Sequence, residues 1–281
     1  MPQPTGPTRS VLITGCSSGI GRDAADALRA RGWHVFATCR QEADCARLRD
    51  EGHESLRLDY EDPASIAAAW DEIASRTGGR LDALFNNGAY AIPGAVEDVP
   101  PDALRAIFEA NLFGWHDLTR RAVVQMRRQG QGRIVQCSSV LGRVAAPWRG
   151  AYVATKFALE GLTDTLRLEL RGSGIRVVLI EPGPIGTRFR QNAARQFERW
   201  IDWEASALAE RYRSGLLQRL YGAGKPDRFE LPASAVTARL IRALEDPSPR
   251  ARYRVTLPTA AAEAMRRTLP TSALDRVLGG R

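Results

Sequence analysis

Lysine, histidine and cysteine are scarce in this chain of 281 residues, and their scarcity excludes several classes of protein. The four cysteines (Cys16, Cys39, Cys45 and Cys137) include no C-x-x-C pair, and the three histidines stand at no metal-ligand spacing. A zinc site or a disulfide framework is therefore not expected. We predict a protein without a metal that resides in the reducing environment of the cytoplasm.

Long apolar runs are missing as well. The longest run, residues 177–180, has the length of a strand and falls far short of the ~18 residues that a membrane-spanning helix needs. The first ten residues contain several Pro and Thr and no apolar stretch of the kind found in signal peptides. We expect residues 1–9 to form a flexible N-terminal segment and the chain to contain no membrane span.

Positive charge is in excess, and arginine supplies nearly all of it. Lys and Arg number 40 against 32 Asp and Glu, which gives a net charge of +8, and only Lys156 and Lys225 are lysines. Such a balance raises nucleic acid or an anionic membrane as a partner. The arginines are dispersed among acidic residues, however, and no basic run with interleaved aromatics appears. We therefore expect no nucleic-acid partner.

The composition is that of an ordinary globular chain, with 44% hydrophobic and 26% charged residues. The length allows two domains or one large α/β unit. Short apolar runs typical of strands alternate with longer amphipathic stretches typical of helices. Strands are expected at residues 10–14, 33–38, 55–58, 81–85, 133–137, 176–180 and 252–256, and helices near 19–31, 42–51, 63–76, 101–129, 150–171 and 232–245.

This alternation predicts a Rossmann-type α/β fold, in which a doubly wound parallel sheet of about seven strands has helices on both faces. No linker or repeat interrupts it, so we expect a single domain over residues 10–281. Residues 188–231 break the rhythm, because they combine a helical pattern with many aromatics and no strand. This substrate-side insertion either packs on the body or a neighbouring subunit, or forms a lid over a hydrophobic substrate site.

A glycine-rich turn, TGCSSGIG at residues 14–21, lies between the first strand and the first helix. Glycines let the backbone approach a pyrophosphate closely, and the following helix directs free N–H groups and its positive dipole end at the anion. Its strand–turn–helix context predicts a dinucleotide-binding site. The candidate cofactor-binding residues in it are Gly15, Ser17, Ser18, Gly19, Ile20 and Gly21.

The end of the second strand distinguishes NAD from NADP. An acidic residue there would bind the ribose 2′-hydroxyl, whereas an arginine accommodates a 2′-phosphate. The strand ends in Arg40, and no carboxylate occurs before Glu42. NADP(H) is therefore preferred, with Ser17 as a second phosphate contact, while NAD(H) remains possible and Arg40 has the alternative of being one of many solvated arginines.

Tyr152 and Lys156 begin another expected helix, and a separation of four residues puts them on one helical face. A free phenol has a pKa of ~10 and is a poor base at neutral pH. An ammonium ~4 Å away is worth up to ~4 kcal/mol, or roughly three pKa units as an upper bound. The spacing thus predicts that Lys156 lowers the pKa of Tyr152, which can then exchange a proton with a carbonyl or an alcohol.

Thirteen residues before Tyr152, the strand at residues 133–137 is followed by Ser138 and Ser139. The carboxyl ends of parallel strands are where ligands bind in such sheets. Ser139 could hydrogen-bond a substrate oxygen there as its charge changes. The three side chains together predict proton-transfer chemistry on an oxygen.

At this point the sequence closely resembles the short-chain dehydrogenase/reductase family, and in particular its hydroxysteroid- and retinol-dehydrogenase-like branch. The resemblance covers roughly residues 10 to 190. The motifs that carry it are TGCSSGIG (14–21), NNGA (86–89), ANLFG around Asn111, SSV (138–140), YVATK (152–156) and EPGPIGT (181–187).

The resemblance implies roles for the catalytic residues. Tyr152 would be the general acid/base, Ser139 would orient the substrate oxygen, and Lys156 would lower the tyrosine pKa and hold the nicotinamide ribose. Asn111 would support a water molecule in a proton relay. Its alternative role is to pin a bend in the helix expected at residues 101–129.

The resemblance also extends the cofactor site. Asp59 matches the adenine contact, Asn87 a backbone position beside the ribose, and Ile185 and Thr187 the contacts to the nicotinamide carboxamide. Asp59 has the alternative of capping the helix that starts at Pro63.

This chain departs from the usual sequence of the family at one motif. The family usually has N-N-A-G where this chain has NNGA, so Ala89 would be mildly strained if that position needs a positive φ.

Relatives place a contact between subunits on the helices near 101–129 and 150–171. A homodimer or homotetramer is therefore implied.

The resulting hypothesis is an NADP(H)-dependent oxidoreductase that interconverts a carbonyl and an alcohol on a small-molecule substrate. The aromatic residues of the insertion and the stretch at residues 144–148 suggest that this substrate is bulky and apolar. The alternative is a catalytically inactive NADP(H)-binding regulatory module of the same fold.

Overall fold

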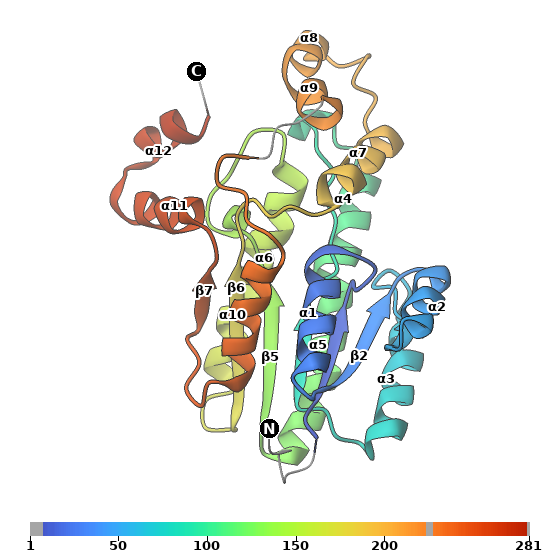
Figure 1. The fold of residues 1–281 in the computed structure, drawn as a ribbon. Coiled ribbons are helices and arrows are strands. Elements are labelled where there is room, and N and C mark those ends of the chain that lie inside the picture. The colour runs from blue at the N-terminus through green and yellow to red at the C-terminus, as the bar shows by residue number, and fades with distance from the viewer. Residues whose placement is uncertain (1–7, 223–226, 280–281) are drawn as a thin grey trace.

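The computed structural model describes residues 8–222 and 227–279. Seven strands form one parallel sheet in the order β3-β2-β1-β4-β5-β6-β7 (Figure 1). The order reverses direction between β1 and β4, so the sheet is doubly wound and the crevice for a ligand lies at the carboxyl ends of these strands. The strands are β1 (Ser10–Thr14), β2 (His34–Cys39), β3 (Glu54–Arg57), β4 (Ala83–Asn86), β5 (Gly132–Cys137), β6 (Ile175–Glu181) and β7 (Arg252–Arg254).

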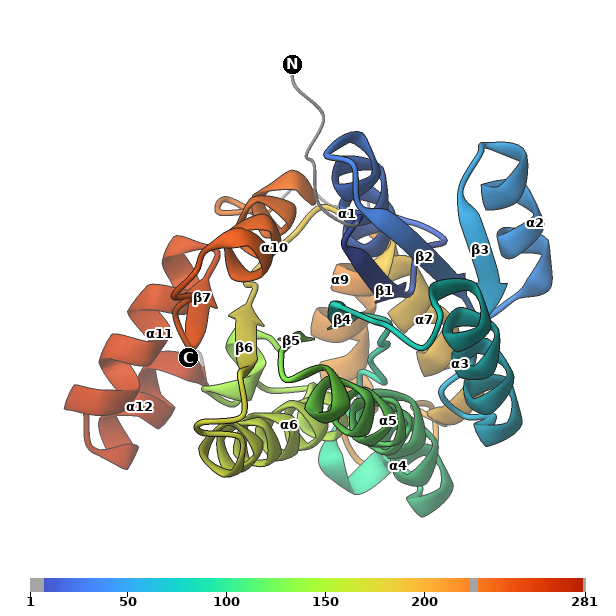
Figure 2. The same ribbon diagram turned by 90° about the horizontal axis from the view of Figure 1, so that it is seen from below.

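Helices cover both faces of the sheet. Figure 2 shows α1 and α10 on one face and α3, α5 and α6 on the other. The helices are α1 (Gly19–Ala30), α2 (Glu42–Asp50), α3 (Pro63–Thr77), α4 (Pro101–Phe108), α5 (Gly114–Gln129), α6 (Gly150–Glu169), α7 (Phe189–Trp200), α8 (Ala209–Arg211), α9 (Leu217–Tyr221), α10 (Ser234–Glu245), α11 (Leu257–Thr268) and α12 (Thr271–Leu278).

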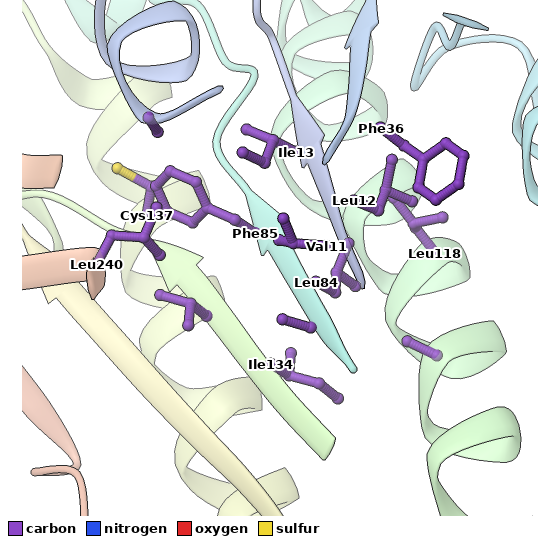
Figure 3. Close-up of a cluster of buried hydrophobic side chains, with 14 of the residues drawn as sticks. Val11, Leu12, Ile13, Phe36, Leu84, Phe85, Leu118, Ile134, Cys137 and Leu240 are labelled. Atoms are coloured by element: carbon purple, nitrogen blue, oxygen red, sulfur yellow. The ribbon is translucent and has the colours of Figure 1, made fainter. Parts of the chain in front are cut away.

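The main core lies on both sides of the central strands because successive strand residues point to opposite faces. Leu12 of β1 lies beside Phe36 of β2 and Leu118 of α5, whereas Ile13 points to the opposite face of the sheet (Figure 3). All four side chains are fully buried. Continuous apolar strands are therefore explained by burial on both faces, as the sequence predicted.

The Rossmann-type architecture predicted from the sequence is confirmed, and each predicted strand overlaps an observed one. The stretch expected as a single helix at residues 101–129 is instead divided. A π-helical turn (Glu109–Phe113) separates α4 from α5. Such one-turn bulges displace the helical register and often occur at functional sites.

Residues 188–222 form a helical segment that we call the lid. It contains α7, α8, a second π-helical turn (Tyr212–Leu216) and α9, and it lies beyond the carboxyl ends of the strands (Figure 1). Its apolar residues build a second hydrophobic cluster with Ile92, Ile107 and the ring of Tyr152. Two parts of these predicted segments lie outside the described residues. They are residues 223–226 of the insertion and residues 1–7 of the N-terminal segment.

The second cluster is centred on the fully buried ring of Tyr212. Its hydroxyl donates to a carboxylate oxygen of Asp98 at 2.7 Å and accepts from the backbone N–H of Ala95 at 2.8 Å. Trp148 packs on the same ring with centroids 4.7 Å apart. The lid is thus attached to the body by buried aromatic packing and by a satisfied polar anchor.

Candidate active site

The glycine-rich turn after β1 is shaped by close backbone contacts. Gly15 has φ +70°, and a Cβ atom there would lie 2.6 Å from the Cα of Gly88. A Cβ at Gly21 would lie 2.3 Å from the carbonyl oxygen of Gly15. Only glycine permits this packing, which leaves a backbone-lined cradle at the start of α1.

The N-terminus of α1 opens into this cradle. Ser18 is the N-cap residue, but its side chain makes no capping hydrogen bond, and the first turn of α1 contains no acidic residue. The first N–H groups of the helix are therefore not satisfied by a cap and are suited to an anion. Ser17, Ser18, Gly19 and Ile20 are all half-buried at this edge.

Arg40 follows β2 directly and is exposed beside the cradle. Within residues 8–222 and 227–279 no carboxylate forms an ion pair with it. Arg47 lies near as well, since its guanidinium donates to the carbonyl oxygen of Ser17 at 3.1 Å and pairs with Asp44 at 2.8 Å. Arg47, on α2, was not among the predicted site residues.

Asp59 lies in the loop after β3, where its carboxylate accepts from the backbone N–H of Glu61 at 3.1 Å. The alternative that Asp59 caps the helix starting at Pro63 is wrong. Asp62 is the N-cap residue, and its side chain accepts from the N–H groups of Ala64 and Ser65. Asp62 directly precedes Pro63, so its carboxylate can accept hydrogen bonds from the N–H groups of the first turn, which Asp59 is too far away to do.

Asn87 is fastened to the end of β1. Its backbone N–H donates to the hydroxyl of Thr14 at 2.8 Å, and its side-chain amide donates to the Thr14 carbonyl at 3.0 Å. The strain considered for Ala89 is not observed, because Trp148 is the only non-glycine residue with positive φ in the part of the chain that is described. The exchange of Gly88 and Ala89 relative to N-N-A-G therefore leaves the backbone relaxed.

The loop after β6 closes the other side of the cradle. A Cβ atom at Gly19 would lie 3.0 Å from the Cγ2 of Thr187, so this loop reaches the turn after β1. Ile185 pairs with Leu231, and the Thr187 hydroxyl accepts from the N–H of Phe189 at 3.3 Å. Ile185 and Thr187 thus stand between the cradle and the beginning of the lid.

Lys156 is buried in the centre of the site. Its Nζ donates to the Cys137 carbonyl at the end of β5 at 2.8 Å and lies 4.3 Å from the ring centroid of Trp115. Burial lowers the pKa of Lys156 to about 8. Trp115, which the sequence did not single out, also donates from its indole to the Gly88 carbonyl at 2.8 Å, so it links the lysine to the cradle.

Tyr152 lies one turn before Lys156 on α6 and is buried. Burial raises the pKa of its phenol well above the ordinary value, Cys137 adds to this, and Ser139 and Arg149 partly counteract it. The direction is opposite to the lowering that the Tyr–Lys spacing predicted. The physical reason is that removal of the phenol from water outweighs the neighbouring positive charges.

Ser139 faces the Tyr152 phenol from the loop after β5. Its hydroxyl oxygen accepts from the Leu141 N–H at 3.1 Å. Because that contact uses the oxygen as an acceptor, the hydroxyl hydrogen can be donated to another group. The structure thus brings Ser139, Tyr152 and Lys156 together at the carboxyl end of β5.

Asn111 lies in the first π-helical turn and is completely buried. Its side-chain amide accepts from the N–H of Tyr90 at 3.1 Å, donates to the Tyr90 carbonyl at 2.8 Å and reaches the Thr155 hydroxyl at 3.3 Å. The side chain therefore pins the helix bulge to the loop after β4 and to α6, which is the alternative role that we considered. Its role in a proton relay stays a prediction.

The lid contributes a side chain directly to the site. Phe189 packs edge-on against the Tyr152 ring with centroids 5.5 Å apart, and it is 36% exposed. The sequence indicated an aromatic-rich insertion but could not place this residue. The side chains around Tyr152 are therefore apolar on the lid side and polar on the strand side.

The arrangement fits a nicotinamide dinucleotide. The glycine cradle with its uncapped helix N-terminus would hold the pyrophosphate. Asp59 and Arg40, which follow β3 and β2, would then face the adenosine, and Lys156 beside Tyr152 lies on the other side of the cradle. Among the residues described, no group of three or more His, Cys, Asp or Glu side chains is placed to bind a metal. Nor does any described helix have the length and hydropathy needed to cross a bilayer.

Comparison with known proteins agrees with this geometry. The family model described as "short chain dehydrogenase" matches residues 9–198. An uncharacterized oxidoreductase, YbbO, of Escherichia coli is 39% identical over 97% of this chain and 94% of its own length. The NADPH-dependent 3-dehydrocapnine reductase of Ornithobacterium rhinotracheale is 30% identical over 96% of this chain and 95% of its own.

Two further similarities concern the branch and the fold. Human 17-beta-hydroxysteroid dehydrogenase type 1 is 34% identical over 68% of this chain and 61% of its own. The crystal structure of a short-chain dehydrogenase/reductase from Burkholderia phymatum in complex with NAD has a TM-score of 0.77 at 25% identity and covers 92% of both chains. The phosphate cradle, the Ser–Tyr–Lys group and these matches together show that the chain belongs to the short-chain dehydrogenase/reductase family of oxidoreductases.

Proposed function

We propose that the protein is an NADP(H)-dependent enzyme that reduces the carbonyl group of a bulky, apolar small molecule to an alcohol. The observation that carries this proposal is the meeting of Ser139, Tyr152 and Lys156 beneath the aromatic lid. The lid side of Tyr152 is lined by an apolar cluster, which favours a substrate with a large hydrophobic body.

Tyr152 acts as the general acid. Because burial raises its pKa, the phenol is protonated at neutral pH and can donate its proton to the carbonyl oxygen. Ser139 accepts from a backbone N–H and so directs its own hydroxyl hydrogen at the same oxygen. The two donors therefore hold the substrate oxygen in one place as negative charge develops on it.

Lys156 supplies the positive charge of the site. Its ammonium lies 5.6 Å from the Tyr152 ring centroid and stabilises the phenolate that remains after proton donation. It also stands where the nicotinamide ribose would be held. A bound nicotinamide cofactor supplies the hydride that the carbonyl carbon receives.

The NADP preference rests on Arg40. It is exposed at the end of β2, and no acidic residue occupies the position that would select a 2′-hydroxyl. The NAD complex of the Burkholderia phymatum relative indicates that members of the family also use NAD. NAD(H) therefore remains a possible cofactor at lower affinity.

We also propose that the enzyme is a homodimer or homotetramer that works in the cytoplasm. Large apolar side chains are exposed on α5 and α6, including Val124 at 54% and Leu162 at 41%. Their burial against a second copy would remove this apolar surface from water. All four cysteines are free and buried, as expected in a reducing compartment.

The direct test is the oxidation of NADPH and of NADH in the presence of a panel of ketones and aldehydes. Wild type should consume NADPH with apolar carbonyl compounds, and Tyr152→Phe should bind NADPH equally well without consuming it. Tight NADPH binding without turnover on the whole panel would instead support the inactive regulatory module. Equal rates in both proteins would show that Tyr152 is not the acid.

A further inference from the structure

Arg149 occupies an unusual position beside the reacting phenol. It precedes Tyr152 by three residues at the N-cap of α6, whereas Lys156 follows by four. Two positive side chains therefore flank the phenol along one face of the helix. Lys156 is turned toward the strand side, and Arg149 lies at the lid end.

The backbone around Arg149 is held firmly. Its carbonyl accepts from the Val153 N–H at 2.8 Å, and the preceding Trp148 has φ +65° with its carbonyl accepting from Gly94 at 3.1 Å. A bulky residue keeps such a conformation only where its surroundings enforce it, here by the packing of the Trp148 ring on Tyr212. The backbone of Arg149 is therefore fixed in place by the contacts of its neighbours.

Two further arginines of the lid lie close enough to Arg149 for their charges to act on it. Arg190 follows Phe189, whose ring contacts Tyr152, and Arg219 lies on α9, which packs against α7. Burial and then these two neighbours lower the pKa of Arg149 to about 10. The half-buried guanidinium thus stands among like charges.

Two of the four carboxylates of the lid have partners elsewhere. Across the described residues, no ion pair involves Arg149, Arg190 or Arg219. In the lid, which contains seven arginines and four acidic residues, Glu198 accepts from the Tyr221 hydroxyl and Glu210 pairs with Arg213. By contrast, the half-buried Arg252 next to α6 contacts three carboxylates.

Arg149 is half-buried, whereas Arg190 and Arg219 are exposed. A half-buried guanidinium that has like charges beside it and no carboxylate partner gains stability when an anion binds there. An oxyanion matches the planar fork of donors that a guanidinium presents. A cofactor phosphate would not be the anion bound by Arg149, because the phosphate cradle lies at the start of α1, next to Gly15 and Gly21. Because Arg149 stands at the N-cap of α6, three residues before Tyr152, an anion bound to it would lie next to the reacting carbonyl group.

We propose that Arg149, assisted by Arg190 and Arg219, binds an oxyanion carried by the substrate, so that the enzyme acts on amphiphilic carbonyl compounds with an apolar chain and an anionic group. This inference rests on the proposed function and adds the charge of the substrate to it. The apolar cluster of the lid binds the chain, and Arg149 sets the direction in which the substrate enters.

The test is calorimetric binding to the NADPH-loaded enzyme, which needs no turnover. Decanoate and its neutral analogue of similar shape, decanamide, are compared, with decyl phosphate as a second anion. In wild type decanoate should bind at least about tenfold tighter than decanamide. Arg149→Gln should reduce this ratio to below about two, and Arg149→Lys should retain part of it.

Matched control variants distinguish an effect of the three arginines on anion binding from a general effect of surface charge. Arg213→Gln removes an exposed lid arginine that already pairs with Glu210, so the ratio should not change. Arg190→Gln and Arg219→Gln, which alter exposed residues, should each lower the ratio without affecting the fold. Tighter binding of decyl phosphate than of decanoate would identify a phosphate as the group, and the reverse would identify a carboxylate.

Turnover distinguishes this inference from the proposed function. The kcat/KM for 4-oxododecanoate should exceed that for its methyl ester in wild type but not in Arg149→Gln. If decanoate binds no tighter than decanamide, or if the ratio survives in Arg149→Gln, the anion site is wrong even when ketones are reduced. If the ratio depends on Arg149 but no carbonyl compound is reduced, the anion site stands and the proposed function fails.

Discussion

The two halves of the site are built by different means. On the cofactor side, the turn after β1 and the loop after β4 meet backbone to backbone, as the 2.6 Å approach to Gly88 by a Cβ at Gly15 indicates. On the lid side, aromatic rings such as Phe189 and Tyr212 make the contacts, and the same segment contains seven arginines. Main-chain geometry therefore defines one half and side-chain identity the other.

This difference predicts which changes each half tolerates. A backbone cradle has no spare volume, so even a methyl group should disrupt it. A cluster of side chains can change its specificity by substitution while the fold persists. The cofactor should thus depend on a few glycines, and the choice of substrate on the lid.

The largest effect is expected for Gly15→Ala. The new Cβ would meet the Cα of Gly88, and its displacement should raise the Kd for NADPH by about 100-fold or more, measured by fluorescence titration. Gly32→Ala is the control, since Gly32 has φ +82° but nothing within 4 Å. It should lose about 1 kcal/mol of stability from the positive φ and bind NADPH normally. Equal loss of binding in both variants would contradict the cradle.

The next effect concerns Arg40 and tests the side-chain part of the cofactor site. Arg40→Leu should lower kcat/KM with NADPH by about 30-fold, because a charge-assisted contact to the 2′-phosphate is lost. The value with NADH should change less than twofold, so NADH is an internal control. A parallel fall with both cofactors would show that Arg40 supports the fold and not the phosphate.

A smaller effect is expected from pH. The pKa of Lys156 is lowered to about 8, so the side chain is charged below that pH and neutral above it. Tyr152, Cys137 and Glu160 are the titratable groups that face it. The kcat/KM for carbonyl reduction should therefore be constant near pH 7 and fall by up to about tenfold per unit above pH 8.

Lys156→Arg provides the control for this profile. A guanidinium keeps its charge over the whole range, so the variant should lose the decline above pH 8 even if it is slower. An unchanged wild-type rate up to pH 10 would contradict the assigned role of the lysine charge.

The smallest effect belongs to the lid. Phe189→Ala should raise KM for an apolar ketone such as 2-decanone by about fivefold, since part of the ring contact with substrate is lost, and leave the Kd for NADPH unchanged. Phe229→Ala removes a ring of similar exposure that, among the described residues, does not pack against the Tyr152 ring, and it should have no effect. A change in NADPH affinity in Phe189→Ala would show that the two halves are not separable.

The sequence placed the glycine-rich turn and the Tyr152–Lys156 pair correctly because their signals are local. Gly15 and Gly21 lie in one short motif, and Tyr152 and Lys156 are one helical turn apart, so spacing alone places them together. The central strands of the sheet were equally recognisable, since burial on both faces makes them largely apolar runs, whereas the edge strands β3 and β7 are short and partly exposed.

The features that the sequence did not predict depend on contacts between residues that are far apart in the chain. Trp115 reaches Lys156 from another helix. The amide of Asn111 is hydrogen-bonded to Tyr90 from the π-helical turn that divides what resembled a single helix. The direction of the Tyr152 pKa shift followed from burial, which spacing does not reveal. Arg149 gave no signal among 38 arginines until its neighbours were known.

The most direct measurement of the central claim is the transfer of deuterium from NADPH labelled on its transferable hydride. Product formed by wild type should carry one deuterium on the carbinol carbon, and it should form at least about 10³-fold faster than in Tyr152→Phe. The label is detected by mass spectrometry in single-turnover reactions with an apolar ketone. Product without deuterium, or equal rates in the two proteins, would contradict carbonyl reduction with Tyr152 as the proton donor.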